Sequence, residues 1–132
     1  MTVNTLSAEI SGLSDLRGAR VGTISGSAAE TLLKRAGFDV AGFPALGEAV
    51  SALQARAVKG VVYDSPMLRY YISQHPGENL DLVGPLFDLQ DYGFAMRLGS
   101  PIRKEVNAAL LKLQVAGEMD SLEKTWFESA GE

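Results

Sequence analysis

Two short stretches of the sequence carry residue types that could bind a charged small molecule. The first is Ser25-Gly26-Ser27-Ala28, which joins an apolar run ending at Ile24 to a helix-forming Ala-Ala-Glu. A helix N-terminus leaves about four backbone N–H groups unpaired and carries roughly half a positive charge. Gly26 would let a ligand approach the backbone closely. A carboxylate or a phosphate is the ligand that such a turn favours.

The same turn has a purely structural interpretation. Ser27 and Glu30 form the pattern S-x-x-E, a capping box in which each side chain accepts a hydrogen bond from a backbone N–H near the other. The two interpretations are compatible, because a capping box leaves other N–H groups for a ligand. Nucleotide patterns are absent: the turn lacks the G-K-[ST] ending of a phosphate-binding loop and the G-x-G-x-x-G spacing of dinucleotide folds.

The second stretch is GVVYD, in which Asp64 follows a short apolar strand. A carboxylate next to a buried strand is unfavourable unless it is paired. Ser65-Pro66 predicts the start of a helix with Ser65 as its N-cap, so Asp64 is not needed for capping. Asp64 could accept a hydrogen bond from a ligand's ammonium group, or it could cap the helix or stay solvated in a loop.

The remaining polar and aromatic positions predict no catalysis. His75, the one histidine, stands in a turn beside Pro76 without a serine or cysteine nucleophile motif, and is expected to be a surface loop residue. Trp126-Phe127 is expected to dock the C-terminus onto the core. The sequence has no cysteine, no cluster at metal-ligand spacing and no carboxylate pair placed for glycoside hydrolysis. We therefore expect no catalytic residue, metal site or cofactor.

Strands and helices alternate along the chain, which predicts parallel strands joined by right-handed crossovers. The expected fold class is α/β, with about five strands in a mostly parallel sheet and helices on both faces. Ligands of such sheets bind at the carboxyl ends of strands, where Ser25-Gly26-Ser27-Ala28 and Asp64 lie. Strands are expected at residues 20–24, 39–43, 60–63, within 80–87 and at 92–98, and helices at residues 28–36, 46–57, 65–74 and 102–116, with a short helix through 126–127.

Length and net charge limit the number of domains and the class of partner. The 132 residues suit one domain, and a net charge of -4 argues against nucleic acid as the partner. Residues 1–12 have no clear period and are expected to be a linker or hinge segment before a single domain at 13–132. The N-terminus shows no signal peptide, so either the protein is cytosolic or the natural chain begins earlier.

An ordered set of segments resembles the second half of a known protein group. The segments are GLSDLRGARVGTISGSAAE, FPALGEAVSALQARAVKGVVYDSP and DYGFAMRLGSPIRKEVNAALLKLQVAGEMDSLEKTWF. They are similar in order and spacing to the amino-acid-binding type II periplasmic solute-binding proteins and to ionotropic glutamate receptor ligand-binding domains, over about residues 11–128. TVNTLSAEISGLSDL looks like the segment after the last pore helix of prokaryotic glutamate-receptor-type channels. In free periplasmic proteins a hinge strand lies at this point.

The resemblance implies a clamshell in which two α/β lobes close on an amino acid such as glutamate or glutamine. The first lobe, absent from this chain, would supply an arginine for the α-carboxylate. The second lobe would supply the turn at Gly26-Ser27-Ala28 and, in Asp64, an acid for the α-amino group. Tyr92, in the YGFA motif, would lie near the cleft. Two positions depart from the family: Ala28 replaces a frequent hydroxyl residue, which removes one ligand contact, and Lys59 replaces a usual acid.

The resemblance also implies partners and a location. The partners would be the amino acid, the missing first lobe, and a channel pore or an ABC-transporter permease, at the periplasmic or extracellular face of a bacterial inner membrane. Two alternatives remain: an enzyme of the same fold, similar to cyclohexadienyl dehydratase, with Asp64 as its acid or base, and a docking module without a ligand.

The helix expected at residues 102–116 has a wider apolar face than one core contact needs, because Leu111 and Val115 extend the stripe formed by Ile102, Val106, Leu110 and Leu113. In the family this helix packs with the first lobe or at a receptor dimer interface. Leu111 and Val115 would then be exposed in this chain, and we expect it to self-associate when purified alone.

Overall fold

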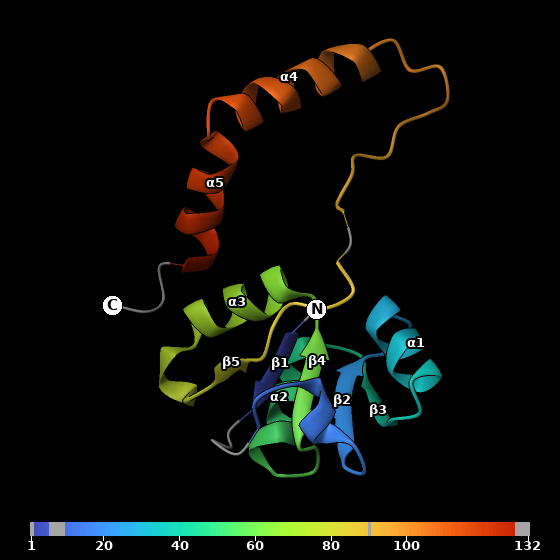
Figure 1. Cartoon of the computed structure of the whole chain (residues 1–132), viewed down its shortest axis with the longest axis vertical. Coiled ribbons are helices and arrows are strands. Elements are labelled where there is room, and N and C mark those ends of the chain that lie inside the picture. The colour runs from blue at the N-terminus through green and yellow to red at the C-terminus, as the bar shows by residue number, and fades with distance from the viewer. Residues whose placement is uncertain (1, 6–9, 90, 129–132) are drawn as a thin grey trace. The chain divides into compact units, whose positions relative to one another are not determined.

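The chain divides into two compact units (Figure 1). A computed structural model describes residues 2–5, 10–89 and 91–128. We call Met1–Leu89 the sheet unit and Gln90–Glu132 the helical unit. Each unit has its own secondary structure and is described by itself.

A single five-stranded sheet forms the centre of the sheet unit. Its strands are β1 (Thr2–Thr5), β2 (Arg20–Ile24), β3 (Asp39–Phe43), β4 (Gly60–Tyr63) and β5 (Asp81–Val83). They lie in the order β3-β2-β4-β1-β5. β2 is parallel to both of its neighbours, with Gly22 opposite Ala41 of β3 and Val61 of β4. β1 pairs antiparallel with β4 and with β5. The predicted α/β class with about five strands is thereby confirmed.

Each of the three parallel strands leads directly into an α-helix. The helices of the sheet unit are α1 (Ala28–Arg35), α2 (Leu46–Gln54) and α3 (Ser65–Gln74), with 3-10 turns at Leu13–Leu16 and Pro76–Glu78. The end of α2 comes earlier than the sequence predicts, because Arg56 adopts a left-handed conformation with φ of 59° and stops the helix.

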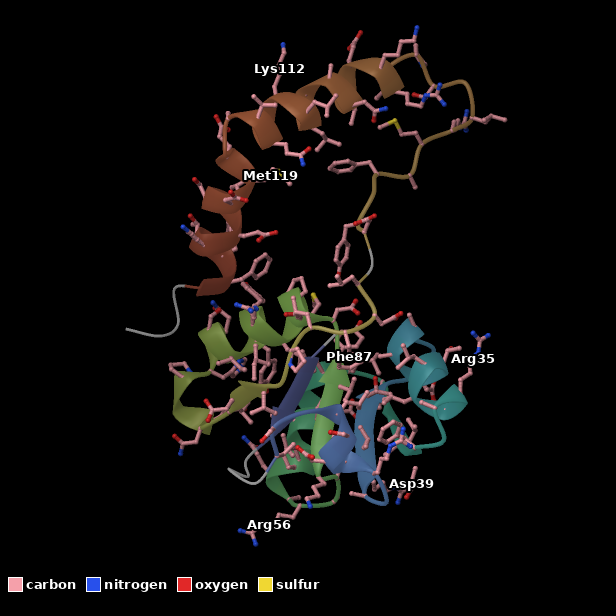
Figure 2. The ribbon with its side chains drawn as sticks, in the orientation of Figure 1. Arg35, Asp39, Arg56, Phe87, Lys112 and Met119 are labelled. Carbon is pink, nitrogen blue, oxygen red and sulfur yellow. The ribbon has the colours of Figure 1, made fainter. Side chains whose placement is uncertain are left out.

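Helices cover both faces of the sheet, as predicted. α1 and the turn at Leu13–Leu16 cover one face, and α2 and α3 cover the other. Val61 and Val62 show the alternation within β4, since each is fully buried but they lie on opposite faces. Phe87, labelled in Figure 2, is half-buried and packs on the α1 face. The buried residues are Ile10, Leu16, Val21, Ala29, Leu33 and Val62 on the α1 face, and Ala49, Val50, Leu53, Val58, Val61, Leu68 and Leu80 on the other.

The segment at residues 1–12 contains an inner strand of the sheet. The sequence predicts a linker or hinge there, and the structure shows β1 between β4 and β5. Four residues are too few to display a hydrophobic period, and so the strand is not visible in the sequence pattern. A hinge strand is one of the forms that the resemblance implies for this stretch, and the hinge role stays a prediction.

The strand predicted at residues 92–98 is not formed, and this part of the prediction is wrong. These residues have no regular secondary structure. A strand requires hydrogen bonds to a neighbouring strand, and the described residues of the helical unit contain no other strand that could supply them.

The helical unit consists of α4 (Arg103–Val115), α5 (Glu118–Glu123) and a π-helical turn at Lys124–Glu128. Lys112 and Met119 mark α4 and α5 in Figure 2. Of the residues from 91 to 127 that the structure describes, none is buried. Trp126, which the sequence predicts to be docked onto the core, is 57% exposed. The helical unit therefore has helices but no core of its own.

Candidate functional site

The carboxyl ends of three parallel strands meet at one edge of the sheet. β2 and β4 are parallel neighbours, with Gly22 opposite Val61, and Ser25 and Asp64 are the residues that directly follow them. Thr23 supports this register, because its buried Oγ1 donates a 2.7 Å hydrogen bond to the Val62 carbonyl. Neighbouring strands lie about 4.8 Å apart. The two stretches that the sequence singled out therefore follow neighbouring parallel strands, at the same edge of the sheet.

At this edge, the connections between strands change the side of β2 on which the next strand lies. The connection from β2 through α1 leads to β3 on one side, and the connection from β3 through α2 leads back across to β4 on the other. Ligands of open α/β sheets bind at such a switch point, outside the carboxyl ends of the strands. The arrowheads of β2 and β4 in Figure 1 point in the same direction, toward this edge.

The turn between β2 and α1 uses most of its own N–H groups within the chain. Ser25 N donates to the Phe43 carbonyl at 2.8 Å, and Ser27 N donates to the Ile24 carbonyl at 3.2 Å. Gly26 N donates to Oε2 of Glu30 at 2.7 Å. Three of the four backbone N–H groups that the sequence suggested for an anion are therefore already paired.

The capping box is present in a shifted form. The Ser27 hydroxyl oxygen accepts a hydrogen bond from Glu30 N at 3.1 Å, as predicted. The Glu30 carboxylate bonds to Gly26 N instead of Ser27 N, because Ser27 N is already bonded to the carbonyl of Ile24. Hydrogen bonds from Lys34 and from Gly26 N lower the pKa of Glu30, so its carboxylate stays charged near neutral pH.

The first two N–H groups of α1 differ in their exposure. Ala28 and Ala29 lie in the first turn, where no carbonyl of the helix can reach their N–H groups. Among the described residues, neither N–H has a recorded acceptor. Ala28, which the sequence interpretation included, is exposed, whereas Ala29, the second residue of the helix, is fully buried in the core of the α1 face. The positive ends of α1, α2 and α3 follow β2, β3 and β4, which favours an anion at this edge.

The N-cap of α3 lies one residue earlier than the sequence predicts. α3 begins at Ser65, so Asp64 is the N-cap residue, although its side chain makes no capping hydrogen bond. Ser65 is buried, and its hydroxyl oxygen accepts a hydrogen bond from Arg69 Nε at 3.3 Å. The serine was a plausible cap by residue type, but burial directs its side chain elsewhere. The half-buried Asp64 therefore lies at the N-cap position of α3, at the carboxyl end of β4.

Tyr92 belongs to the helical unit, whereas the other predicted site residues belong to the sheet unit. Its side chain is 75% exposed. Its predicted place near the cleft stays a prediction.

A second group of polar side chains lies at the end of α3. The His75 ring stacks on Tyr71 with centroids 4.1 Å apart, and its Nδ1 lies 2.8 Å from the Tyr71 carbonyl. Because a carbonyl only accepts, Nδ1 carries the proton. Burial, followed by the nearby Glu78 carboxylate, raises the pKa of Tyr71. His75 is exposed, as predicted, and serves to close the end of the helix.

Neither metal-binding nor membrane-spanning features occur in the part of the chain that the structure describes. No group of three or more histidine, aspartate or glutamate side chains there is placed to hold a metal ion. No described helix has the length and apolar character needed to cross a bilayer.

Solved structures similar to this chain include amino-acid-binding domains. The GluR0 ligand-binding core from Nostoc punctiforme, in complex with L-glutamate, is 33% identical with a TM-score of 0.78, covering 96% of this chain and 59% of that one. The second substrate-binding domain of a putative amino acid ABC transporter from Streptococcus pneumoniae is 25% identical, also with a TM-score of 0.78, covering 96% of this chain and 60% of that one.

A relative found by sequence is also a glutamate receptor. The human protein "Glutamate receptor ionotropic, kainate 5" is 42% identical over 50 residues, which are 38% of this chain and 5% of the receptor. No family model matches the chain. The chain spans about three fifths of the two solved structures and a small part of the receptor.

The fold and these likenesses define an α/β lobe of the type II periplasmic-binding-protein class. Within that class, the chain is similar to amino-acid substrate-binding domains and to the ligand-binding core of GluR0, and it resembles the second-lobe part of such a domain. The resemblance predicted from the sequence is thus confirmed. The relatives named above are ligand-binding or substrate-binding domains and receptors, not enzymes.

Proposed function

We propose that this chain is the second-lobe half of an amino-acid-binding clamshell, with a ligand of the glutamate or glutamine type. Ser27 and Ala28 bind a carboxylate of the ligand, and Asp64 binds its α-ammonium group. The observation that carries the proposal is the parallel pairing of β2 with β4, because Ser25 and Asp64 directly follow these neighbouring strands at the topological switch of the sheet.

The two ends of an amino acid match the charges of this edge. The start of α1 offers the N–H group of the exposed Ala28 and the Ser27 hydroxyl hydrogen, both of which donate. The Asp64 carboxylate accepts, and its bond to an ammonium group would be charge-assisted. Ala28 supplies no side-chain hydroxyl, so its backbone N–H group holds the carboxylate. Ser25 and Gly26 shape the turn, because their own N–H groups are paired within the chain.

The helical unit is proposed to complete the cleft together with the first lobe. Tyr92 then borders the ligand, and α4 packs with the first lobe or at a receptor dimer interface. Closure of the two lobes shifts an open state toward a closed one and transmits binding to a channel gate or a transporter permease. This places the protein at the periplasmic or extracellular face of a bacterial inner membrane. With one lobe present, we expect weak affinity.

Replacement of Asp64 tests the proposal. We expect L-glutamate to shift the backbone ¹⁵N–¹H resonance of Ala28 in the wild-type chain, and Asp64→Asn to weaken binding about tenfold or more through loss of a charged hydrogen bond. Asp39→Asn is the matched control, because Asp39 begins β3 at the opposite edge of the sheet (Figure 2). Equal affinity of the wild type and Asp64→Asn would overturn the assignment.

The same variant separates the proposed function from its alternatives. A dehydratase-like enzyme would lose turnover in Asp64→Asn while still binding its substrate, and a docking module would show neither ligand binding nor an effect of the variant. The upstream coding sequence separates the two kinds of binding protein. A first lobe followed by pore segments indicates a channel, and a signal peptide with a first lobe alone indicates a transporter component.

A further inference from the structure

We infer that Glu30 is a positioning residue for the ligand carboxylate, an inference that rests on the proposed function. Glu30 links the turn to the first turn of α1 through two hydrogen bonds. Its backbone N–H donates to Ser27 Oγ at 3.1 Å, and its carboxylate accepts from Gly26 N at 2.7 Å. Glu30 therefore holds both Gly26 and Ser27, the two residues that directly precede α1.

Glu30 stabilises one of several backbone conformations that are open to Gly26. Gly26 has a left-handed φ of 75° in the structure. In an unfolded or mobile loop, glycine adopts this conformation and several others. A carboxylate bound to the Gly26 N–H favours the single turn geometry that leads into the exposed Ala28 at the helix start. Binding then loses less conformational entropy, which is the usual gain from preorganisation.

Lys34 and Gly42 hold the carboxylate in place. Lys34 Nζ lies 2.8 Å from Glu30 Oε1, one helical turn further along α1, and the Glu30 side chain is only 17% exposed. Gly42 of β3 leaves the space that the group needs. A Cβ atom at position 42 would lie 2.5 Å from Ser25 Oγ and 3.0 Å from Glu30 Oε1, too close for either atom to stay where it is.

Gly42 offers a way to disturb Glu30 from a distance. Gly42 is exposed on an edge strand, and the atoms nearest to a Cβ atom there belong to the side chains of Ser25 and Glu30, so we expect Gly42→Ala to leave the fold intact. Gly77→Ala is the matched control, because a Cβ atom at Gly77 meets no atom within 4 Å. Glu30→Ala removes the carboxylate, and Glu30→Gln keeps an oxygen that can accept from Gly26 N.

The test follows L-glutamate binding and backbone N–H exchange in the whole ¹⁵N-labelled chain. We expect Glu30→Ala and Gly42→Ala to weaken L-glutamate binding about fivefold and to speed hydrogen exchange at Gly26. The affinities of Glu30→Gln and Gly77→Ala for L-glutamate should stay within about twofold of the wild-type affinity, since both variants keep an acceptor for Gly26 N. Near-wild-type binding by the Glu30→Gln variant would show that Glu30 acts by positioning the turn and that its negative charge is not required.

Three results would overturn the inference. One is wild-type affinity in both Glu30→Ala and Gly42→Ala. Another is a loss of affinity accompanied by faster exchange throughout α1, which would mean that Glu30 only stabilises the helix. The third is an affinity of Glu30→Gln as low as that of Glu30→Ala. If the wild type itself shows no L-glutamate shift at Ala28, the proposed function fails as well, and Gly26 exchange still reports whether Glu30 holds the turn.

Discussion

The sheet unit and the helical unit differ in how they bury apolar side chains. In the sheet unit, helices cover both faces of the sheet and form two clusters of buried residues. In the helical unit, none of the described residues from 91 to 127 is buried, and apolar side chains such as Leu111 and Val115 are 62% and 88% exposed. The two units come from one sequence with similar helix signals, yet only one has a core.

This difference shows which unit is complete. Burial of apolar area is the main favourable term in folding, and isolated helices shorter than about 12–15 residues are marginal in water. α4 has 13 residues, which lies within that range, so we expect a partner to increase its stability. The proposed partner is the first lobe, and a second copy of the chain can take its place when that lobe is absent.

The largest expected effect is a loss of stability on truncating a core leucine of the sheet unit. Leu68 of α3 is fully buried. We expect Leu68→Ala to lower the free energy of unfolding by about 2–5 kcal/mol, through lost burial and the cavity that remains. Leu111→Ala, the matched change in the helical unit, should alter it by less than about 0.5 kcal/mol. Urea unfolding of both variants measures the contrast, and equal losses would contradict it.

The next effect concerns self-association through α4. We expect the purified chain to form dimers, and the double variant Leu111→Glu, Val115→Lys to weaken dimerisation about tenfold or more, because two charges would enter an apolar contact. Sedimentation velocity over a range of concentrations measures this. A wild-type chain that stays monomeric at high concentration would show that the exposed face of α4 needs no partner.

A smaller effect is expected at the helix cap that shapes the site. Ser27 Oγ accepts the only side-chain capping bond of α1, so Ser27→Ala should lower the free energy of unfolding by about 1 kcal/mol. Ser121→Ala in α5 removes a hydroxyl that bonds within the helical unit and should have little effect on the same transition. Chemical denaturation of the two variants compares the units at single hydroxyl groups.

The smallest effect is a dependence of stability on acid. The pKa of Glu30 is lower in the folded state than its ordinary value of 4.5, so the folded state favours the charged carboxylate. This contribution is fully present above pH 4.5 and is lost as the pH falls through that value toward the lowered pKa. We expect the stability difference between the wild type and Glu30→Gln to shrink as the pH is lowered. Urea midpoints across that range measure it, and a constant difference would contradict the role of the charge.

Much of the sheet unit was predictable because its signals are local. β2, β3 and β4 begin and end where the sequence predicts, since each is a short apolar run bounded by turn residues. Ser27 caps α1 as its S-x-x-E pattern indicates, and Gly37 follows the helix with φ of 80°. These features depend on residues within a few positions of one another.

Other features were not predictable, because they depend on distant partners. β1 is a strand through its pairing with β4 and β5, while residues 92–98 have strand-forming side chains but no strand beside them. The bond from Gly26 N to Glu30 departs from the usual capping box because the Ile24 carbonyl already accepts from Ser27 N. Competition between acceptors appears only once the turn has folded.

The sequence by itself determined the α/β class, the two strand ends that carry Ser27 and Asp64, and the resemblance to amino-acid-binding lobes. Those properties follow from hydrophobic period, turn residues and helix-start residues, which act over short distances along the chain. Only the tertiary structure decided that the two strands lie side by side, and which N–H groups of the turn before α1 are paired within the chain. Strand order and hydrogen-bond partners arise from contacts between segments far apart in sequence, and those contacts form only when the chain packs.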